Sequence, residues 1–82
     1  MTDFVGKYIN IKQTGILPRT LVWSVFAKEG GYLVGTIKWY GAWRKYAFLP
    51  QPNTVFEEVC LAEIGQFIAA RTAAHRSKAA SC

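Results

Sequence analysis

The sequence has little of the chemistry on which most enzymes and metalloproteins depend. It contains a single histidine, His75, which lies in a basic helical segment and is expected to be solvated. No set of histidines and cysteines has the spacing of metal ligands, and no glycine motif that cradles phosphate opens a helix. The carboxylates of Glu57, Glu58 and Glu63 are typical of helix capping and solubility rather than of an acid–base pair. We therefore expect no enzymatic activity, no metal and no cofactor.

The chain also lacks a disulfide framework and a long apolar run. Cys82 is the last residue, and Cys60 lies on the apolar side of a helical pattern without a neighbouring base, so it is a poor nucleophile. Two such thiols are typical of a reducing compartment. Residues 1–7 have no apolar run of signal-peptide length, and no segment approaches the ~20 apolar residues of a membrane span. These features predict a cytoplasmic protein without a membrane partner.

Acidic residues are few, and their placement is uneven. The net charge is +5. Residues 30–56 contain no acid but include Lys38, Arg44 and Lys45, and the segment from Arg71 onward has no acid either. Excess positive charge raises the rate of encounter with polyanions such as nucleic acid or acidic proteins. The charge pattern favours both kinds of partner without choosing between them.

The sequence does contain three β-branched and aromatic runs followed by one helical pattern. The runs cover residues 20–27, 32–39 and 43–49, and glycines mark the turns between them. Prolines at positions 50 and 52 end the sheet. Apolar side chains then recur at helical spacing, namely Cys60, Leu61, Ile64, Phe67 and Ile68. The pattern predicts an α+β fold in which a three-stranded antiparallel sheet packs on one C-terminal amphipathic helix.

The start of the predicted helix carries its own signals. Thr54 and Glu57 fit a capping box, in which the threonine accepts from the helix amides and the glutamate reaches back. Gly65 weakens the helix from within, which suggests that a strand passes close to it. Beyond His75 the helix is expected to fray.

The N-terminal segment is the hardest part of the chain to place. Residues 8–13 alternate well enough for a short extra strand with Ile9 and Ile11 on one face, and Gly15 and Pro18 then interrupt it. The sequence thus predicts three parts of the chain, namely an N-terminal segment at 1–19, a single α+β domain at 20–76 and a disordered tail at 77–82.

The register of the last hairpin decides which side chains the sheet exposes. A two-residue loop would pair Lys38 with Lys45, and a three-residue loop would set Lys38 opposite Arg44. Either register places two cations across from each other, which costs from a few tenths to about 1 kcal/mol without an anion. Long side chains that separate in water explain such a pair, and so does a surface that binds an anion.

One helix covers only one face of the sheet, so the other face must meet something else. A large aromatic patch is seldom left idle on a monomer. The N-terminal segment, a second copy of the chain or a ligand would each cover it, and the sequence leaves all three open. The candidate binding residues on and beside this face are Tyr32, Lys38, Tyr40, Trp43, Arg44 and Lys45.

Two functions fit these residues. In a nucleic-acid-binding protein, the lysines would neutralise phosphates while the aromatic rings stack on bases, at about 1–3 kcal/mol for each base. In a protein-interaction module, the same rings and Arg44 would be the interface hot spots toward an acidic protein or a second copy of the chain.

Parts of the sequence resemble a group of phage proteins. The resemblance is carried by GTIKWYGAWRKYAF (35–48), PNTVF (52–56) and CLAEI (60–64). These segments are similar to short, uncharacterised proteins encoded by tailed phages and prophages. The resemblance implies a phage origin and action inside a bacterial host, and it implies no activity and no catalytic residues.

The predicted order of elements is a second, weaker likeness. Three strands followed by a helix is similar to the arm-binding domain of phage integrases and to the plant ethylene-response DNA-binding domain. Both insert a face of their sheet into the major groove. The likeness is one of architecture, since no motif of either family is matched here.

Overall fold

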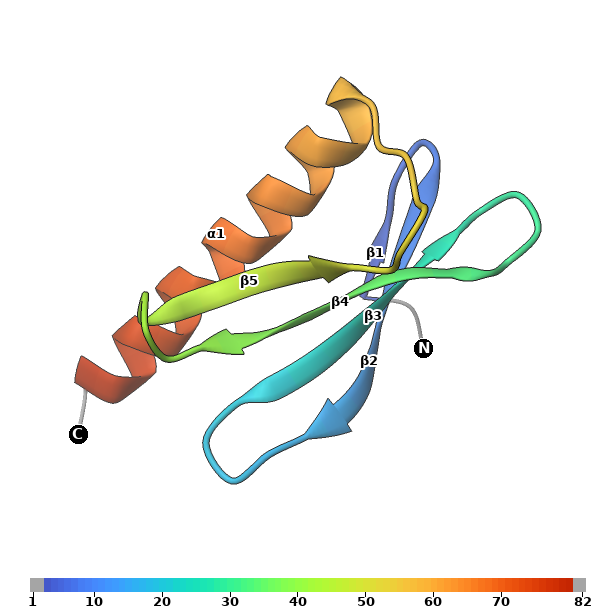
Figure 1. Cartoon of the computed structure of the whole chain (residues 1–82). Helices are drawn as coiled ribbons and strands as arrows, with labels where there is room; N and C mark the ends of the chain where they lie inside the picture. Colours follow the sequence, from blue (N-terminus) through green and yellow to red (C-terminus); the bar gives the residue numbers. More distant parts are fainter. Residues whose placement is uncertain (1–2, 81–82) are drawn as a thin grey trace.

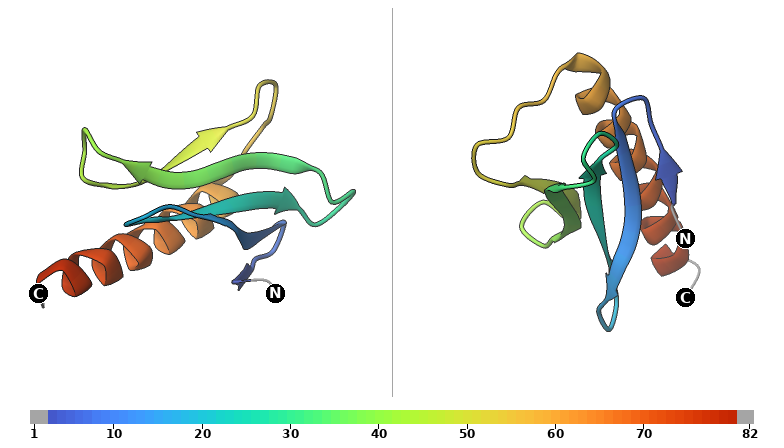
Figure 2. Two further views of the ribbon diagram at one scale, coloured as in Figure 1. Left: turned by 90° about the horizontal axis from the view of Figure 1, so that it is seen from below. Right: turned by 90° about the vertical axis from the view of Figure 1, so that its right-hand side faces the viewer.

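The computed structural model of the chain describes residues 3–80, with side chains described as far as residue 77. Its elements in chain order are β1 (Phe4–Val5), β2 (Ile9–Ile16), β3 (Leu21–Ala27), β4 (Leu33–Tyr40), β5 (Lys45–Pro50) and α1 (Glu58–Ala80). The five strands form one antiparallel sheet in the order β1-β2-β3-β4-β5, so that each strand pairs with its neighbour in sequence (Figure 1). Helix α1 crosses one face of this sheet, and within the described residues no helix or strand covers the other face (Figure 2).

The α+β class with one C-terminal helix is confirmed, but the prediction of three strands is wrong. The N-terminal segment does not fold over the sheet face that α1 leaves uncovered. It supplies β1 and β2, and β2 pairs with β3 from Ile9 opposite Ala27 to Ile16 opposite Leu21. Gly15 does not end the strand. A β-bulge shifts the register between Gln13 and Gly15, and the pairing of β2 with β3 continues beyond it. The sequence allowed one extra strand. The structure has a two-stranded hairpin there instead, and this hairpin widens the sheet.

The hydrophobic core lies between α1 and the covered face of the sheet. Alternate residues of the strands point to the same side, so Ile9 and Ile11 share one face as predicted, and the structure buries both against α1. Trp23 is the centre of this core, and its ring meets Tyr46 and Phe67 edge to face at centroid distances of 5.0 and 5.3 Å. The buried members are Ile9, Ile11, Trp23, Val25, Val34, Ile37, Tyr46, Cys60, Ile64 and Phe67.

The predicted apolar stripe of the helix is only partly buried. Ile64 and Phe67 face the sheet, whereas Leu61 is 54% exposed. Gly65 lies on the exposed side, and apart from its chain neighbours and the adjacent backbone of α1, no atom stands within 4 Å of the position that a Cβ would take there. The expectation that a strand passes close to Gly65 is therefore wrong. The backbone stays helical to Ala80, and residues 81 and 82 of the expected tail lie outside the described residues.

The helix begins at Glu58, about one turn later than the predicted capping box implies, and a different residue caps it. The Cys60 amide donates to Glu57 Oε1 at 2.7 Å, so Glu57 is the N-cap. Thr54 Oγ1 instead donates to the Gln51 carbonyl at 2.7 Å and closes the turn before the helix. The capping box that starts at Thr54 is thus wrong, because the threonine lies one turn too early along the chain.

The capping bond makes the stability depend on pH. The Cys60 amide favours the ionised form of Glu57, so the pKa of this carboxyl lies below its ordinary value of 4.5. The cap therefore stabilises the fold above the unfolded-state pKa, and its contribution is lost as the pH falls through the folded-state pKa. We expect Glu57→Gln to lower the urea midpoint at neutral pH and to reduce the loss of stability on acidification. Glu58→Gln removes the same charge without removing the cap, and an equal effect of both changes would contradict this assignment.

Candidate functional site

The β4–β5 hairpin adopts neither of the two predicted registers. Tyr40 pairs with Lys45, which leaves a four-residue loop and sets Lys38 opposite Ala47. The pair of facing cations expected in both registers is therefore absent. The hairpin closes with Arg44 in the left-handed region, at φ 53°. A non-glycine residue seldom adopts this conformation, so nothing in the local sequence pointed to the longer loop.

The sheet face turned away from α1, here called the open face, has a basic and polar centre. Residues paired directly across neighbouring strands share a face, so the register places Lys12, Ser24 and Thr36 in one row across β2, β3 and β4. Lys38 is the next residue of β4 on that face. Near the hairpin, Lys45 shares the face through its pairing with Tyr40. The polar members of the open face are Asn10, Lys12, Thr14, Ser24, Thr36, Lys38, Tyr40 and Lys45.

Lys12 is a member of this face that sequence reasoning missed. It lies on β2, which the sequence left as an uncertain short strand, and it reaches the face through its pairing with Ser24. Thr14 Oγ1 and Ser24 Oγ lie 2.7 Å apart, so hydroxyls link the two strands on the same side. The alternation around Ile9 and Ile11 was the signal that could have found Lys12, because the residue that follows Ile11 in a strand must face away from the core.

Two aromatic rings stand at the hairpin end of the open face. Tyr40 and Trp43 meet edge to face, with centroids 4.7 Å apart, and they are 46% and 65% exposed. Tyr32 is also exposed, but it precedes β4 and so lies at the opposite end of that strand from Tyr40. The structure thus brings Lys38, Tyr40, Trp43 and Lys45 together and separates Tyr32 from them.

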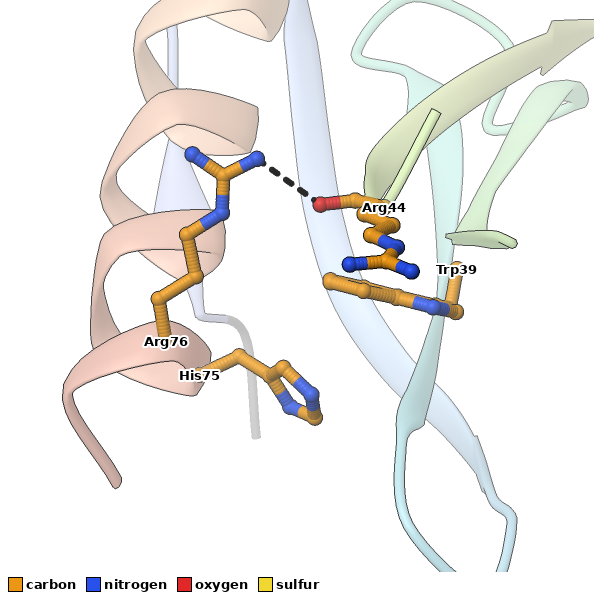
Figure 3. Close-up of a pocket in the computed structure, with 4 residues that line it drawn as sticks. All are labelled: Trp39, Arg44, His75 and Arg76. Atoms are coloured by element: carbon orange, nitrogen blue, oxygen red, sulfur yellow. Dashed lines mark hydrogen bonds between the residues drawn. The ribbon is translucent and has the colours of Figure 1, made fainter. Parts of the chain in front are cut away.

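Arg44 turns to the other side of the hairpin. With Trp39, His75 and Arg76 it lines a shallow pocket where the hairpin meets the last turns of α1 (Figure 3). The expectation that His75 is solvated is wrong: the side chain is half-buried, and its ring centroid lies 4.4 Å from that of Trp39. Sequence reasoning did not connect the helix end with the hairpin, because the two are far apart along the chain.

A longer groove runs between the β2–β3 turn and the C-terminal half of α1. Its volume is about 730 Å³, and Trp23 and Arg71 are among the side chains that line it. The Arg71 guanidinium carbon lies 5.2 Å from the centroid of the Trp23 ring. Ile16 and Leu17 form one wall and are 75% and 50% exposed. Trp23 Nε1 is buried and has no hydrogen-bond partner among the described residues.

Comparison with known proteins places this chain among phage proteins. No family model and no solved structure matches it. A curated relative from Acholeplasma phage L2, described as an uncharacterised 9.3 kDa protein, is 32% identical over 62 residues. The match covers 76% of this chain and 77% of the relative. The chain belongs to this family of small phage proteins. The resemblance to short phage proteins predicted from the sequence is thereby confirmed.

Two further properties of this phage-family protein bear on its chemistry. Among residues 3–80, no three histidine, cysteine, aspartate or glutamate side chains come together as a metal site would require, and α1 is not long and apolar enough to cross a membrane. Burial raises the pKa of the Cys60 thiol. A thiol with a raised pKa stays protonated at neutral pH, so Cys60 acts as a small apolar side chain of the core.

Proposed function

We propose that this phage-family protein is a non-enzymatic accessory protein that binds nucleic acid through the open face of its sheet, in the cytoplasm of a bacterial host. One observation carries the proposal. Lys12, Lys38 and Lys45 share a sheet face that has no acidic strand residue among those described, and the exposed Tyr40–Trp43 pair stands at its end.

The composition of the open face suits both the phosphate backbone and the bases of a nucleic-acid strand. Lysines that approach phosphates release condensed counterions, which supplies most of the affinity of such an interface. Neighbouring hydroxyls such as those of Ser24 and Thr36 can donate to phosphate oxygens and fix the position of the backbone. The exposed rings of Tyr40 and Trp43 can stack on bases, and unpaired bases are available for this only in a single strand. The face therefore favours single-stranded nucleic acid over duplex.

Three acidic side chains accept hydrogen bonds from backbone amides. Asp3 Oδ2 accepts from the Gln13 amide at 2.7 Å on the edge of the sheet. Glu63 accepts from the Lys7 amide at 3.0 Å and ties the β1–β2 turn to α1. Glu57 is occupied as the helix cap. These bonds leave the ammonium groups of Lys12, Lys38 and Lys45 available to an anionic ligand.

A titration with oligonucleotides at two salt concentrations tests the proposal. We expect the tryptophan fluorescence of the full chain to change saturably with a short single strand and less with a duplex. The affinity should fall with salt with a slope of about −2 on a double logarithmic scale, if three lysines each meet one phosphate at about −0.7 per contact. Trp43→Phe should remove most of the fluorescence change. A response that is flat, or that does not depend on salt, would overturn the proposal.

A protein partner is the second candidate, and the groove beside α1 favours it. Ile16 and Leu17 expose apolar surface there, while Arg19 and Arg71 line the groove without an acidic side chain among its described residues. Such a surface suits a protein segment that carries both apolar and acidic side chains. A flat oligonucleotide titration would leave this candidate as the stronger one.

A further inference from the structure

Two surfaces of the chain carry opposite charge, and both expose apolar side chains. The first is the groove between the β2–β3 turn and α1, where Ile16 and Leu17 are exposed and no acidic side chain belongs to the described lining. The second is the start of α1, where Val55 is 94% exposed and precedes the exposed carboxylate of Glu58. Leu61 is also exposed and follows Glu58 by three positions, so it lies on the same side of the helix. Val55, Glu58 and Leu61 are here called the acidic tip.

Arginines stand on both sides of the groove. Arg19 belongs to the β2–β3 turn, and Arg71 belongs to α1. The Arg71 guanidinium carbon lies 5.2 Å from the ring centroid of Trp23 and 5.1 Å from that of Phe67, so these rings hold the side chain in place. An arginine that is already held loses less conformational freedom when it binds a carboxylate. The groove is therefore suited to an anionic group that lies beside apolar side chains.

The surface of the groove favours a protein over a nucleotide or a small apolar ligand. The Trp23 and Tyr46 rings are buried. The His75 ring packs on Trp39, so the groove offers a base little aromatic surface on which to stack. A small-molecule site encloses most of its ligand, whereas one wall of this groove consists of side chains that are at least half exposed. An open, partly apolar and cationic groove suits a protein surface.

The acidic tip of a second copy of the chain supplies the matching groups. Glu58 brings a carboxylate for the arginines, and the two apolar side chains of the tip can cover the apolar wall of the groove. The tip cannot enter the groove of its own molecule. Glu58 and Arg71 are about 20 Å apart along α1, at about 1.5 Å per residue. The contact therefore requires two molecules.

We infer that copies of this chain associate head to tail, with the acidic tip of one molecule in the groove of the next. The two surfaces in contact differ from each other, so every pair leaves one groove and one tip free. Association therefore continues to a ring or a filament instead of ending at a dimer. The inference goes beyond the proposed function, because no nucleic acid takes part in the contact.

The contact leaves the open face available. Ile16 pairs with Leu21, and Leu21 alternates with Trp23, so the groove lies on the α1 side of the sheet. The acidic tip lies on the same side, because it includes the first turn of α1. Copies joined in this way can each bind a stretch of one long strand, which would make the binding of long strands cooperative. A short strand that holds a single copy gains nothing from the contact.

Analytical ultracentrifugation of the full chain over a range of concentrations tests the contact. We expect the weight-average mass to rise above the monomer mass of 9.2 kDa at low salt, and to rise less at high salt because salt screens the charges. Val55→Ser with Glu58→Gln removes the tip, and Ile16→Ser with Arg19→Gln changes one wall of the groove. Each double variant should weaken association about 10- to 100-fold, because a few side chains carry most of the energy of an interface.

A mixture of the two double variants tests the head-to-tail arrangement. The tip variant keeps an intact groove and the groove variant keeps an intact tip, so the mixture should form a dimer that cannot grow further. Formation of this dimer also shows that both variants are folded. Val5→Ser with Glu29→Gln is the matched control, since it removes an exposed apolar side chain and an exposed carboxylate away from both surfaces. The control should associate as the unchanged chain does.

Three results would overturn the inference. They are a chain that stays at 9.2 kDa at every concentration, double variants that associate as well as the unchanged chain, and a mixture that stays monomeric. In the first case the groove is left to a segment of another protein. If the chain associates as expected but no oligonucleotide binds, the proposed function fails and the head-to-tail contact stands. If oligonucleotides bind to a chain that never associates, the contact fails and the proposed function stands.

Discussion

Gly35→Ala is expected to destabilise the fold by about 2–3 kcal/mol, since overpacking a buried site usually costs this much. A Cβ at Gly35 would stand against the ring of Phe48, and it would lie 2.9 Å from the Leu49 carbonyl oxygen on the neighbouring strand. The ring cannot easily withdraw, because Phe48 packs edge to face on Phe56 with centroids 5.2 Å apart. The backbone oxygen belongs to the β4–β5 ladder and can move only if the strands separate. A domain of this size has about 4–12 kcal/mol of stability in total, so the urea midpoint should fall markedly.

Gly65→Ala is the matched control for this prediction. The same methyl group enters open space on the exposed side of α1, and alanine is favoured over glycine inside a helix by about 1 kcal/mol. The two substitutions should therefore change the free energy of unfolding in opposite directions. If Gly35→Ala is neutral or stabilising in urea denaturation, the close approach of Phe48 to β4 is not a feature of the protein in solution.

The double variant Lys12→Glu, Lys38→Glu is expected to lower the affinity for a single-stranded oligonucleotide by about 100-fold or more at low salt. It removes two phosphate contacts and replaces each with a charge that repels phosphate. The slope of affinity against salt should become shallower by about 1.4, which is two contacts at about 0.7 each. Both side chains are exposed, so the fold should be retained, as a thermal denaturation curve would verify.

A second double variant separates the open face from the net charge. Arg19→Glu with Lys28→Glu changes the total charge by the same amount, but both positions lie in turns outside the strands. It should reduce the affinity far less, through long-range attraction alone. If the two double variants lose equal affinity, nucleic acid binds the protein through its net charge alone, and the proposal that it binds at the open face is wrong.

Several parts of this fold follow from local chemistry. Strands β3, β4 and β5 lie close to the predicted runs 20–27, 32–39 and 43–49, because β-branched and aromatic side chains suit a half-buried pleated surface. The helix was expected from its apolar spacing, and its core-facing residues Ile64 and Phe67 are buried. The alternation of Ile9 with Ile11 also pointed correctly to the face that they share, which the structure buries.

The candidate site was foreseen less completely than the fold. Lys38, Tyr40, Trp43 and Lys45 were identified from their charge or aromatic character and from the alternation of the predicted hairpin strands, and the structure brings them together. Tyr32 was assigned to the same face, but it falls before β4 begins. Lys12 was missed because the alternation of Ile9 with Ile11 shows only which side of β2 it occupies, and its place on the open face also depends on β2 pairing with β3.

The sequence by itself determined the class of the fold, the placement of most strands and the single helix, and the excess of cations over acids, since these depend on residue type and short-range periodicity. Only the tertiary structure decided the number of strands, the hairpin register and the neighbours of each cation. The register depended on Arg44 taking a left-handed conformation that the sequence does not signal. The pocket depended on α1 returning along the sheet until Arg76 reached the Arg44 carbonyl. Both are long-range outcomes of packing, in which the burial of Trp23 and its neighbours outweighs any local preference.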